Sequence, residues 1–277
     1  MERIGLNGAT LPGRDLLTKI AATAAAGFSL YEPRVPELLA YNSPEGRRTV
    51  VQAMSESGLD WLPLNALEGV FAADRAAFVA AETILPLAAR FGISHVIAVP
   101  APPGDGLDRT AAVSELRRLI ARAEAEGVSL LYELIGFAHH AYPTLELAGD
   151  VARDVGLPLV LDTFHLAVSE ASADAIGALD PDRIGLVHLS DALVGDRPIA
   201  AITDDDRVLP DEGELPLSEM LDAIGRTGFG GPISVEVFHS KYAREPTDRV
   251  ASRALAEARR LTAAWRWTSK QGERTGA

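Results

Sequence analysis

Residues 158–168 read "PLVLDTFHLAV". The first four residues form an apolar run that is typical of a strand buried on both faces. Asp162 and His165 follow before the run has ended, although burying a carboxylate without a partner is strongly unfavourable. A charge at this place therefore predicts a fold that brings other polar groups to the end of the strand.

Seven further runs of this kind alternate with longer helical patterns along the chain. In the helical segments 15–28 and 111–127, apolar residues recur every three or four positions and a glycine stands near the end, as is common just after a helix. Nearly continuous apolar strands separated by helices are typical of a parallel sheet with both faces covered. The eight runs are residues 3–8, 28–33, 59–67, 95–101, 128–135, 158–165, 184–192 and 232–238.

Eight strand–helix units within 277 residues match the size of a closed barrel. An open doubly wound sheet usually carries a glycine-rich phosphate loop after its first strand, but "GLNGATLPG" (5–13) contains neither GxGxxG nor a Walker pattern. We therefore predict an α/β fold, a (β/α)8 TIM barrel, in one domain over residues 1–267, with a flexible tail over 268–277. The long connection 193–215 is predicted to fold over the barrel mouth.

The composition indicates which kinds of binding partner and which cellular compartment to expect. A net charge of −13 and a pI near 4.9 disfavour nucleic acids and anionic membrane surfaces. The chain has no cysteine, so disulfides and thiolate metal ligands are excluded and a reducing cytosol is compatible. The first residues do not resemble a secretory signal, and no apolar stretch is long enough to span a membrane. We expect a cytoplasmic protein with neither a nucleic-acid nor a membrane partner, and the sequence leaves a homo-oligomer open.

Polar side chains stand late in four successive apolar runs, the fifth to the eighth. They are Glu133, Asp162, His188 and Glu236. In a closed parallel barrel the carboxyl ends of the strands converge on one mouth, so these side chains are predicted to meet. Three carboxylates and an imidazole satisfy one another around a cation, whereas a purely structural ion-pair cluster is the alternative. We predict one divalent metal ion, with Mn²⁺ or Zn²⁺ favoured and Mg²⁺ or Co²⁺ left open.

Other candidates lie around the same predicted mouth. His165 could contact a substrate hydroxyl or cap the neighbouring helix. Arg207 could reach a substrate oxygen from the long connection or form a surface salt bridge with residues 204–206. Position alone makes three more residues candidates for a functional role: Glu32, Asn65 and Glu68.

The remaining histidines, acids and tryptophans are interpreted more simply. His139 and His140 are mouth residues with no assigned role. Asp191 is expected to orient His188 or the long connection rather than bind metal, because metal-bound imidazoles usually need a supporting acceptor. Three residues are expected to support packing: His95, Trp265 and Trp267.

These stretches resemble the xylose isomerase-like superfamily of metal-dependent barrels, which includes sugar epimerases, keto-inositol isomerases and endonuclease IV. The resemblance runs over nearly the whole chain, and within the superfamily it is strongest to the 2-keto-myo-inositol isomerase-type sugar isomerases. It is carried by "VLDTFH" (160–165), "VHLSDA" (187–192), residues 206–238, "LNALEGVF" (64–71) and "YELIGF" (132–137).

The resemblance implies roles for the residues at the mouth. Glu133, Asp162, His188 and Glu236 match the family's four metal ligands, and the two glutamates would also move protons on either side of the substrate. His165 and Arg207 would hold substrate hydroxyls. The implied function is a metal-dependent isomerase or epimerase of a keto-sugar or keto-inositol, acting by proton transfer through a metal-bound enediolate.

Two other enzyme classes and a binding role remain as alternatives. A dehydratase of inosose or dehydroshikimate would use the same metal site. An endonuclease would need histidines where this chain has Asn65 and Pro100, together with a basic groove. A catalytically silent sugar-binding protein is the third. We expect a small, unphosphorylated polyol or keto-sugar, although Asp211 replaces a family glycine and "FAHHAYP" (137–143) has no counterpart in the family pattern.

Overall fold

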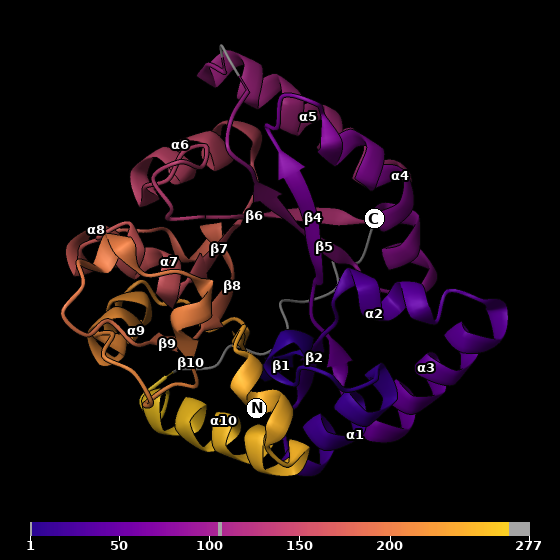
Figure 1. The fold of residues 1–277 in the computed structure, drawn as a ribbon. Helices are drawn as coiled ribbons and strands as arrows, with labels where there is room; N and C mark the ends of the chain where they lie inside the picture. Colours follow the sequence, from indigo (N-terminus) through magenta and orange to yellow (C-terminus); the bar gives the residue numbers. More distant parts are fainter. Residues whose placement is uncertain (1, 105–106, 266–277) are drawn as a thin grey trace.

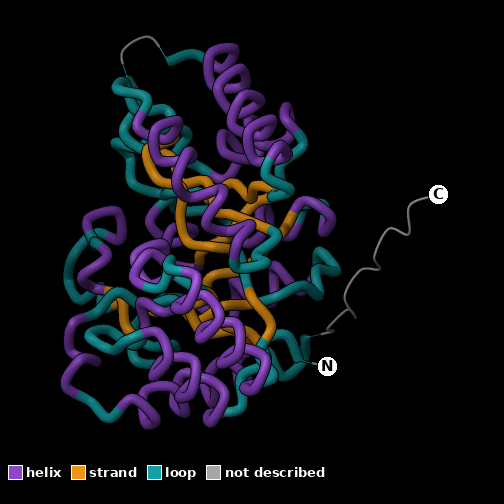
Figure 2. The backbone as a smooth tube through the Cα atoms, turned by 90° about the vertical axis from the view of Figure 1, so that its right-hand side faces the viewer, coloured by secondary structure: helices purple, strands orange, loops and turns teal. Residues whose placement is uncertain are grey.

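The computed structural model describes residues 2–104 and 107–265. A sheet curls around the centre of the molecule and helices surround it, as Figure 1 shows. In the view turned by 90°, the strands run through the middle with helices outside them (Figure 2). The predicted barrel architecture is therefore confirmed, whereas Trp267 and the predicted tail 268–277 lie outside the described residues.

Each of the eight predicted apolar runs contains a strand of the central sheet. The strands are β1 (Ile4–Asn7), β2 (Leu30–Glu32), β3 (Asp60–Trp61), β4 (Leu64–Val70), β5 (His95–Pro100), β6 (Ser129–Glu133), β7 (Leu159–Asp162), β8 (Ile184–Leu189) and β11 (Ile233–Val235). Their order is β3-β2-β1-β11-β8-β7-β6-β5-β4. All neighbouring pairs run parallel, which confirms the parallel sheet.

One predicted strand, residues 59–67, is divided into β3 and β4. Pro63 stands between the two parts, and proline has no N–H with which to continue a ladder. β3 pairs with β2, and β4 pairs with β5. An isolated parallel bridge joins Arg34 to Asn65, and the Asn65 N–H donates to the Pro33 carbonyl at 3.0 Å. The two ends of the sheet therefore meet at this point and close the barrel.

Amphipathic helices cover the outside of the sheet. They are α1 (Leu16–Ala26), α2 (Val35–Ala40), α3 (Pro44–Ser57), α4 (Ala76–Arg90), α5 (Arg109–Ala125), α6 (Leu145–Val155), α7 (Thr163–Val168), α8 (Ala173–Gly177), α9 (Leu217–Arg226) and α10 (Thr247–Leu261). The segment 15–28 shows why they begin and end where they do. The Asp15 side chain accepts from the Thr18 N–H, and Gly27 takes the left-handed conformation at φ 93°, where a side chain would be strained.

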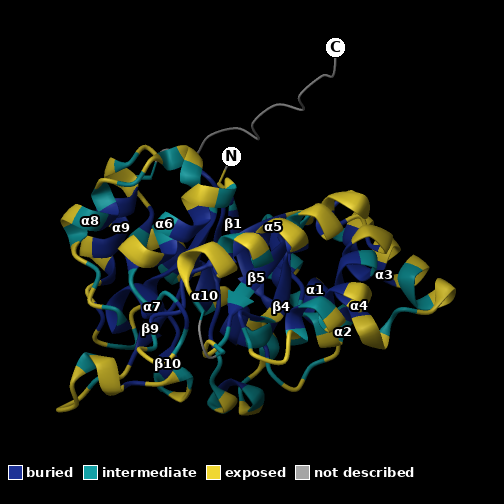
Figure 3. Ribbon diagram, turned by 90° about the horizontal axis from the view of Figure 1, so that it is seen from above, coloured by how far each residue is buried: buried dark blue, intermediate teal, exposed yellow. Residues whose placement is uncertain are grey.

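Apolar side chains pack on both faces of the sheet. Figure 3 shows buried residues on the strands and inner helix faces, with exposed residues on the outer helix surfaces. The larger cluster joins the helices to the outside of the barrel. A smaller cluster comes from successive strands and contains no helical residue, so it fills the barrel interior: Leu30, Leu62, Ala66, Ile97, Leu131, Val160 and Leu186.

Short elements complete the connections. Within 193–215 lie η3 (Ile199–Ala201), η4 (Asp204–Asp206) and β10 (Arg207–Val208), and β10 pairs antiparallel with β9 (Asp191–Ala192). This hairpin-like return carries Arg207 back to the mouth, as predicted for the long connection. The other short helices are η1 (Gly8–Thr10), η2 (Pro181–Arg183) and η5 (Ser240–Arg244). No helix in the described ranges is long and apolar enough to cross a membrane.

Candidate metal centre

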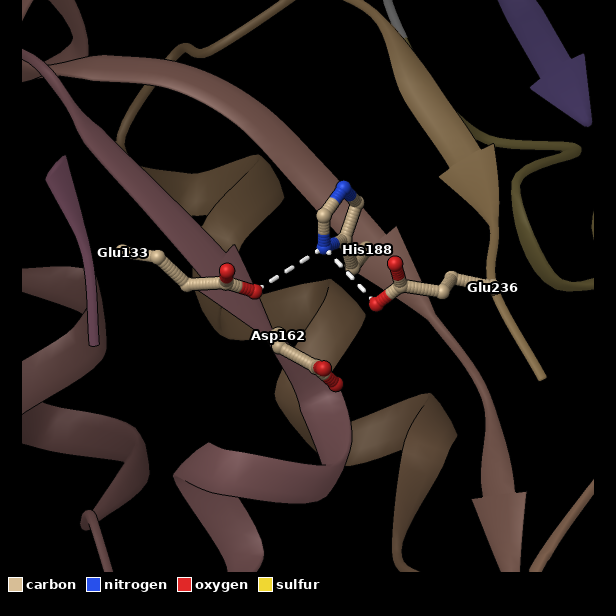
Figure 4. Close-up of side chains that lie close together, drawn as sticks. All are labelled: Glu133, Asp162, His188 and Glu236. Carbon is tan, nitrogen blue, oxygen red and sulfur yellow. Dashed lines mark hydrogen bonds and ion pairs between the residues drawn. The ribbon is translucent and has the colours of Figure 1, made fainter. Parts of the chain in front are cut away.

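The four predicted strand-end residues lie together at the mouth. Glu133 ends β6, Asp162 ends β7, His188 lies near the end of β8 and Glu236 follows β11. Their side chains point toward one another in Figure 4. Each offers one ligand atom, and these atoms all lie within 4.8 Å of one another. All four residues are buried.

Strand periodicity explains why these side chains share one face. Leu131, Val160 and Leu186 belong to the apolar layer inside the barrel. Residues two positions apart on a strand point to the same side, so Glu133, Asp162 and His188 stand directly above that layer. The register of the strands also brings these residues to the same height. Asp162 pairs with His188 on β8, and His188 pairs with Ser234 on β11, two residues before Glu236. The sequence thus places the four polar side chains on top of the apolar layer inside the barrel.

His188 lies at the centre of this group. Its Nδ1 is 3.1 Å from Oε1 of Glu133 and 3.1 Å from Oε2 of Glu236. Its Nε2 is 3.1 Å from Oε1 of Glu32, on the other side of the ring. A metal-bound histidine typically has this arrangement, with one nitrogen toward the ion and the other donating to a carboxylate.

Burial and charge shift the proton affinities of the group strongly. Burial raises the pKa of Glu133 to about 7. Burial acts to raise the pKa of Glu236 as well, but the charges of His188, Arg207 and Arg34 lower it to about 2. For His188, burial acts to lower the pKa, but Glu236, Glu32 and Glu133 outweigh it and raise the value well above its usual range. The ionised forms of the buried acids are therefore stable only with positive charge nearby.

The donor set fits a divalent cation. Three carboxylates and one imidazole suit a hard or borderline ion, and the short spacing lets one ion contact all four. A bound cation would neutralise the carboxylates in place of the extra proton that they otherwise hold on His188.

Arg207 is also buried, with 1% of its surface exposed. Its Nη1 donates to Oδ2 of Asp162 at 2.7 Å and to Oγ of Ser190 at 3.1 Å. Its Nε donates to Oδ1 of Asp204 at 2.8 Å. The alternative of a surface salt bridge with residues 204–206 is therefore wrong in part. The contact with Asp204 exists, but the guanidinium lies inside the site because it must also satisfy Asp162.

His165 lies in α7 rather than at its start, so it does not cap that helix. Its Nε2 is 3.2 Å from Nη2 of Arg207. Arginine only donates, so Nε2 must accept and the neutral ring carries its proton on Nδ1. Burial, and then the Arg207 charge, lower the pKa of His165 well below its usual value. Asp162 performs the capping instead, because its Oδ1 accepts from the Phe164 N–H at 2.8 Å.

The sequence analysis also named residues at strand ends without assigning them a role. Asn65 Nδ2 donates to Oε1 of Glu32 and Oε1 of Glu236, both at 2.9 Å. Glu68 is exposed and lies at the rim of the cavity, outside the four-residue group. Asn7 was missed, although it ends β1 and donates to Oε1 of Glu236 at 2.9 Å. The same rule, applied to the first strand, would have found it.

A cavity of about 380 Å³ opens above the group. Its walls are largely apolar, from Val99, Ile135, Phe137 and Phe238, which suits a small carbon skeleton. The polar lining residues include Arg34, Asn65, Glu133, His140, His165, Asp204, Arg207 and Glu236.

The fold and the site agree with a family model described as "Xylose isomerase-like TIM barrel", which matches residues 20–261. The chain belongs to this family. Within the xylose isomerase-like TIM barrels, the inosose isomerase of Bacillus subtilis (strain 168) is 30% identical over 158 residues, which cover 54% of this chain and 56% of that protein. The match with the Bacillus velezensis inosose isomerase likewise covers 64% of that relative. This chain therefore matches somewhat under two thirds of these relatives' lengths.

Two further proteins are similar over more of this chain. The 3-dehydroshikimate dehydratase of Pseudomonas putida (strain KT2440) is 29% identical over 262 residues, covering 91% of this chain and 40% of that protein. The crystal structure of the IolI protein with a bound zinc atom superposes with a TM-score of 0.87 at 23% identity, covering 96% of this chain and 100% of that one. At this identity the superposition shows the shared fold.

The departures from the family pattern have defined places in the structure. Asp211 has φ 72°, in the left-handed region that favours glycine and that aspartate tolerates better than most residues. It lies in the long connection and forms an ion pair with Arg260. In the segment 137–143, His140 Nδ1 lies 3.0 Å from the Pro100 carbonyl and its ring lines the cavity. His139 stacks on Phe137, with ring centroids 5.9 Å apart.

Asp191 holds the long connection rather than His188. Its Oδ1 accepts from the Ala192 and Leu215 N–H groups at 2.8 and 2.9 Å, and its Oδ2 accepts from the Gly213 N–H at 3.0 Å. The acceptor that supports His188 is Glu32. The sequence had offered both roles for Asp191, and only the one toward the connection is observed in the described part of the chain.

Replacing Asp191 by alanine is expected to lower the free energy of unfolding by about 1–3 kcal/mol, because buried N–H groups lose their acceptor. Urea unfolding measures this loss. Asp211→Asn in the same connection keeps a residue that tolerates the left-handed conformation and removes only the charge of an exposed ion pair, so it should cost less than about 1 kcal/mol. Equal losses in the two variants would contradict the anchoring role of Asp191.

Proposed function

We propose that this protein is a divalent-metal-dependent isomerase or epimerase of a keto-sugar or keto-inositol. The carrying observation is the buried group of three carboxylates and one imidazole at the base of a cavity of about 380 Å³. The proposed ligands are Glu133, Asp162, His188 and Glu236. The inosose isomerase names of its relatives support the substrate class.

The proposed cation is Mn²⁺ or Zn²⁺, and the zinc bound in the similar IolI structure supports the second. When bound, such a cation would polarise a ketone oxygen and stabilise negative charge that develops on it. The chain's own residues must then move a proton between neighbouring carbons, exclude water and orient the substrate.

Glu133 is the better placed of the two glutamates to take the first proton. Its Oε1 faces His188, whereas its Oε2 has no hydrogen-bond partner in the described part of the chain. Its raised pKa, about 7, suits a group that both accepts and returns a proton near neutral pH. In Glu236, Oε1 accepts two amide donors and Oε2 faces His188. We assign proton removal to Glu133 and proton handling on the other side of the substrate to Glu236.

Arg207 and His165 are proposed to bind the substrate. Nε, Nη1 and Nη2 of Arg207 make four hydrogen bonds within the site, so one of its five N–H groups is left for a ligand oxygen. Its guanidinium also packs 4.1 Å from the Phe164 ring centroid, which fixes its orientation. His165 lines the cavity beside it.

Solvent-deuterium incorporation tests this function. Purified protein loaded with Mn²⁺ or Zn²⁺ is incubated in D₂O with a panel of keto-inositols and ketoses, and the label is followed by NMR. We expect exchange at the carbon next to the ketone, together with an isomeric product. Ligand-induced thermal stabilisation without exchange across the panel would instead favour a silent sugar-binding protein.

A dehydratase is the second candidate, and Arg34 favours it. The Arg34 guanidinium lines the cavity and lies 4.7 Å from the Phe238 ring centroid. It forms no ion pair and donates no hydrogen bond to the described residues. A substrate carboxylate would satisfy it, and the similar 3-dehydroshikimate dehydratase acts, by its name, on a carboxylate-bearing substrate. Such a reaction would expel a hydroxyl after proton removal and yield a conjugated product absorbing in the near ultraviolet.

Arg34→Gln separates the two candidates. If the substrate carries a carboxylate, the variant should raise KM by about 10- to 100-fold, because a hydrogen bond to a charged group is lost. For a neutral keto-inositol the change should be under about threefold on the same grounds. Arg75→Gln is the matched control, since Arg75 also packs on an aromatic ring, Phe78 at 5.8 Å, but is exposed and does not line the cavity.

A further inference from the structure

We infer that Asn65 is a positioning residue that holds two opposite sides of the metal group through one carboxamide. The inference rests on the metal centre proposed above. Asn65 is not one of the four proposed ligands, and its Nδ2 donates to carboxylates instead. It acts through Glu32 and Glu236, which contact the two nitrogens of His188.

Four side chains form a closed ring of contacts. Nδ2 of Asn65 donates to Oε1 of Glu32 at 2.9 Å, and that oxygen lies 3.1 Å from Nε2 of His188. On the other side, Nδ1 of His188 lies 3.1 Å from Oε2 of Glu236, and Oε1 of Glu236 accepts from Asn65 Nδ2 at 2.9 Å. The exposed surface of these residues ranges from 0% to 6%, so water does not compete for these contacts.

The chemistry of the ring requires an amide at position 65. One NH₂ group supplies two N–H donors, and both are used by carboxylates. An aspartate of the same shape would set a third acceptor against two others in a buried site, which is strongly unfavourable. By keeping Glu32 against Nε2, Asn65 favours the tautomer that carries its proton there. The lone pair of Nδ1 is then directed at Glu133 and Glu236, where an ion would bind.

The backbone fixes Asn65 at the point where the barrel closes. Its N–H donates to the Pro33 carbonyl at 3.0 Å, one residue after Glu32. One backbone hydrogen bond therefore fixes both the donor, Asn65, and the segment that carries one of its acceptors, Glu32. A side chain that positions metal ligands is thus held by the contact that joins the two ends of the sheet.

Asn7 supplies a matched comparison. Its Nδ2 also donates to Oε1 of Glu236 at 2.9 Å, while its Oδ1 accepts from the Ala9 N–H at 2.8 Å. Asn7 is paired with Glu32 across the neighbouring strands β1 and β2, but in the described structure its side chain forms no hydrogen bond with Glu32 or His188. Loss of its amide removes one donor from Glu236 and leaves the His188 side intact, whereas loss at Asn65 affects both.

The experiment measures Zn²⁺ affinity by competition with a chromophoric chelator, and the His188 tautomer by NMR of the Zn²⁺-loaded, ¹⁵N-histidine-labelled protein. Asn65→Asp and Asn65→Ser are expected to weaken Zn²⁺ binding by about 10- to 100-fold, the range seen when groups that support metal ligands are lost. The protonated Nε2 signal of His188 should also shift or broaden. Asn7→Ser should weaken binding less and leave that signal in place.

A compensating change distinguishes positioning from general damage. In Asn65→Asp combined with Glu32→Gln, the new carboxylate faces a neutral side chain at position 32 instead of a second carboxylate, and an oxygen in the place of Oε1 still accepts from His188. This double variant should recover part of the Zn²⁺ affinity lost in Asn65→Asp. If Asn65→Asp does not fold, Asn65→Ser decides by the same readouts.

Three results would overturn the inference: wild-type Zn²⁺ affinity in the Asn65 variants, an unchanged His188 signal, or an equal effect of Asn7→Ser on both readouts. None of these measurements uses a substrate, so failure of the proposed isomerase activity would not affect them. Wild-type protein that binds no Zn²⁺ or Mn²⁺ would overturn the metal centre itself and this inference with it.

Discussion

Replacing Glu133 by glutamine is expected to lower turnover by about 10²- to 10⁴-fold, the usual contribution of a positioned acid–base group. Glutamine keeps the shape of the side chain and one oxygen that can face His188, but it cannot accept a proton. The fold should persist, because a buried carboxylate with one unpartnered oxygen becomes a neutral amide. Deuterium incorporation from D₂O, followed by NMR, measures the loss directly at the proton-transfer step.

Controls for this variant come from the same chain. Glu146→Gln on α6 removes an exposed carboxylate and should leave exchange unchanged, which shows that the substitution as such is harmless. Glu236→Gln tests the second glutamate. Its Oε1 receives two amide donors, and a glutamine there must turn an oxygen to them or lose one bond. Full exchange in both Glu133→Gln and Glu236→Gln would refute the assigned roles.

The clustering of the proposed ligands was predictable because strand ends in a parallel barrel have a fixed direction. Glu133, Asp162 and His188 each follow an apolar residue two positions earlier, and that pair of residues fixes both the face and the height of the side chain. The buried charge in "PLVLDTFHLAV", Asp162, is paired in the structure with Arg207, whose Nη1 lies 2.7 Å from Oδ2 of Asp162. A pattern of burial was enough to find the group.

The hydrogen bonds that surround the four proposed ligands could not be predicted in the same way. Glu32 and Asn65 were recognised by position, but their shared hydrogen bonds depend on the meeting of β2 and β4, two segments 33 residues apart. The strand 59–67 was expected to be continuous, and the break at Pro63 is what lets one part pair with β2 and the other with β5. Sequence patterns report which face a residue takes, whereas these contacts depend on how the sheet closes.

Arg34 shows a second limit. It follows a strand end by two residues, and its sequence context gives no sign that it faces the cavity. Its stacking on Phe238 depends on a residue about 200 positions later. The same ring lies 5.6 Å from the Arg207 guanidinium. Phe238 therefore packs near two guanidiniums, that of Arg207, which has internal partners, and that of Arg34, for which the described residues supply no ion pair. Such contacts around the cavity are fixed by tertiary packing, so the local sequence does not reveal them.

Exhaustive chelation is expected to abolish turnover and to lower thermal stability. A cation present at 1,000 times its dissociation constant stabilises the folded protein by about 4 kcal/mol. In a chain of this size that corresponds to a fall in Tm of roughly 10 °C when the ion is removed. Calorimetry measures the fall, and elemental analysis before chelation identifies the native metal. Adding back Mn²⁺ or Zn²⁺ should restore both activity and Tm.

Variants of the ligands give this prediction its specificity. In Asp162→Asn and His188→Gln, chelation should change Tm by less than about 3 °C, because the donor set is weakened and less binding energy can be lost. Glu146→Gln should keep the full shift. The metal-dependent part of the stability must therefore follow the four residues that Figure 4 brings together. A chelated sample that is free of metal by elemental analysis and still fully active would show that the buried acids serve another purpose, with His188, Arg207 and Arg34 as the positive charges that act on them.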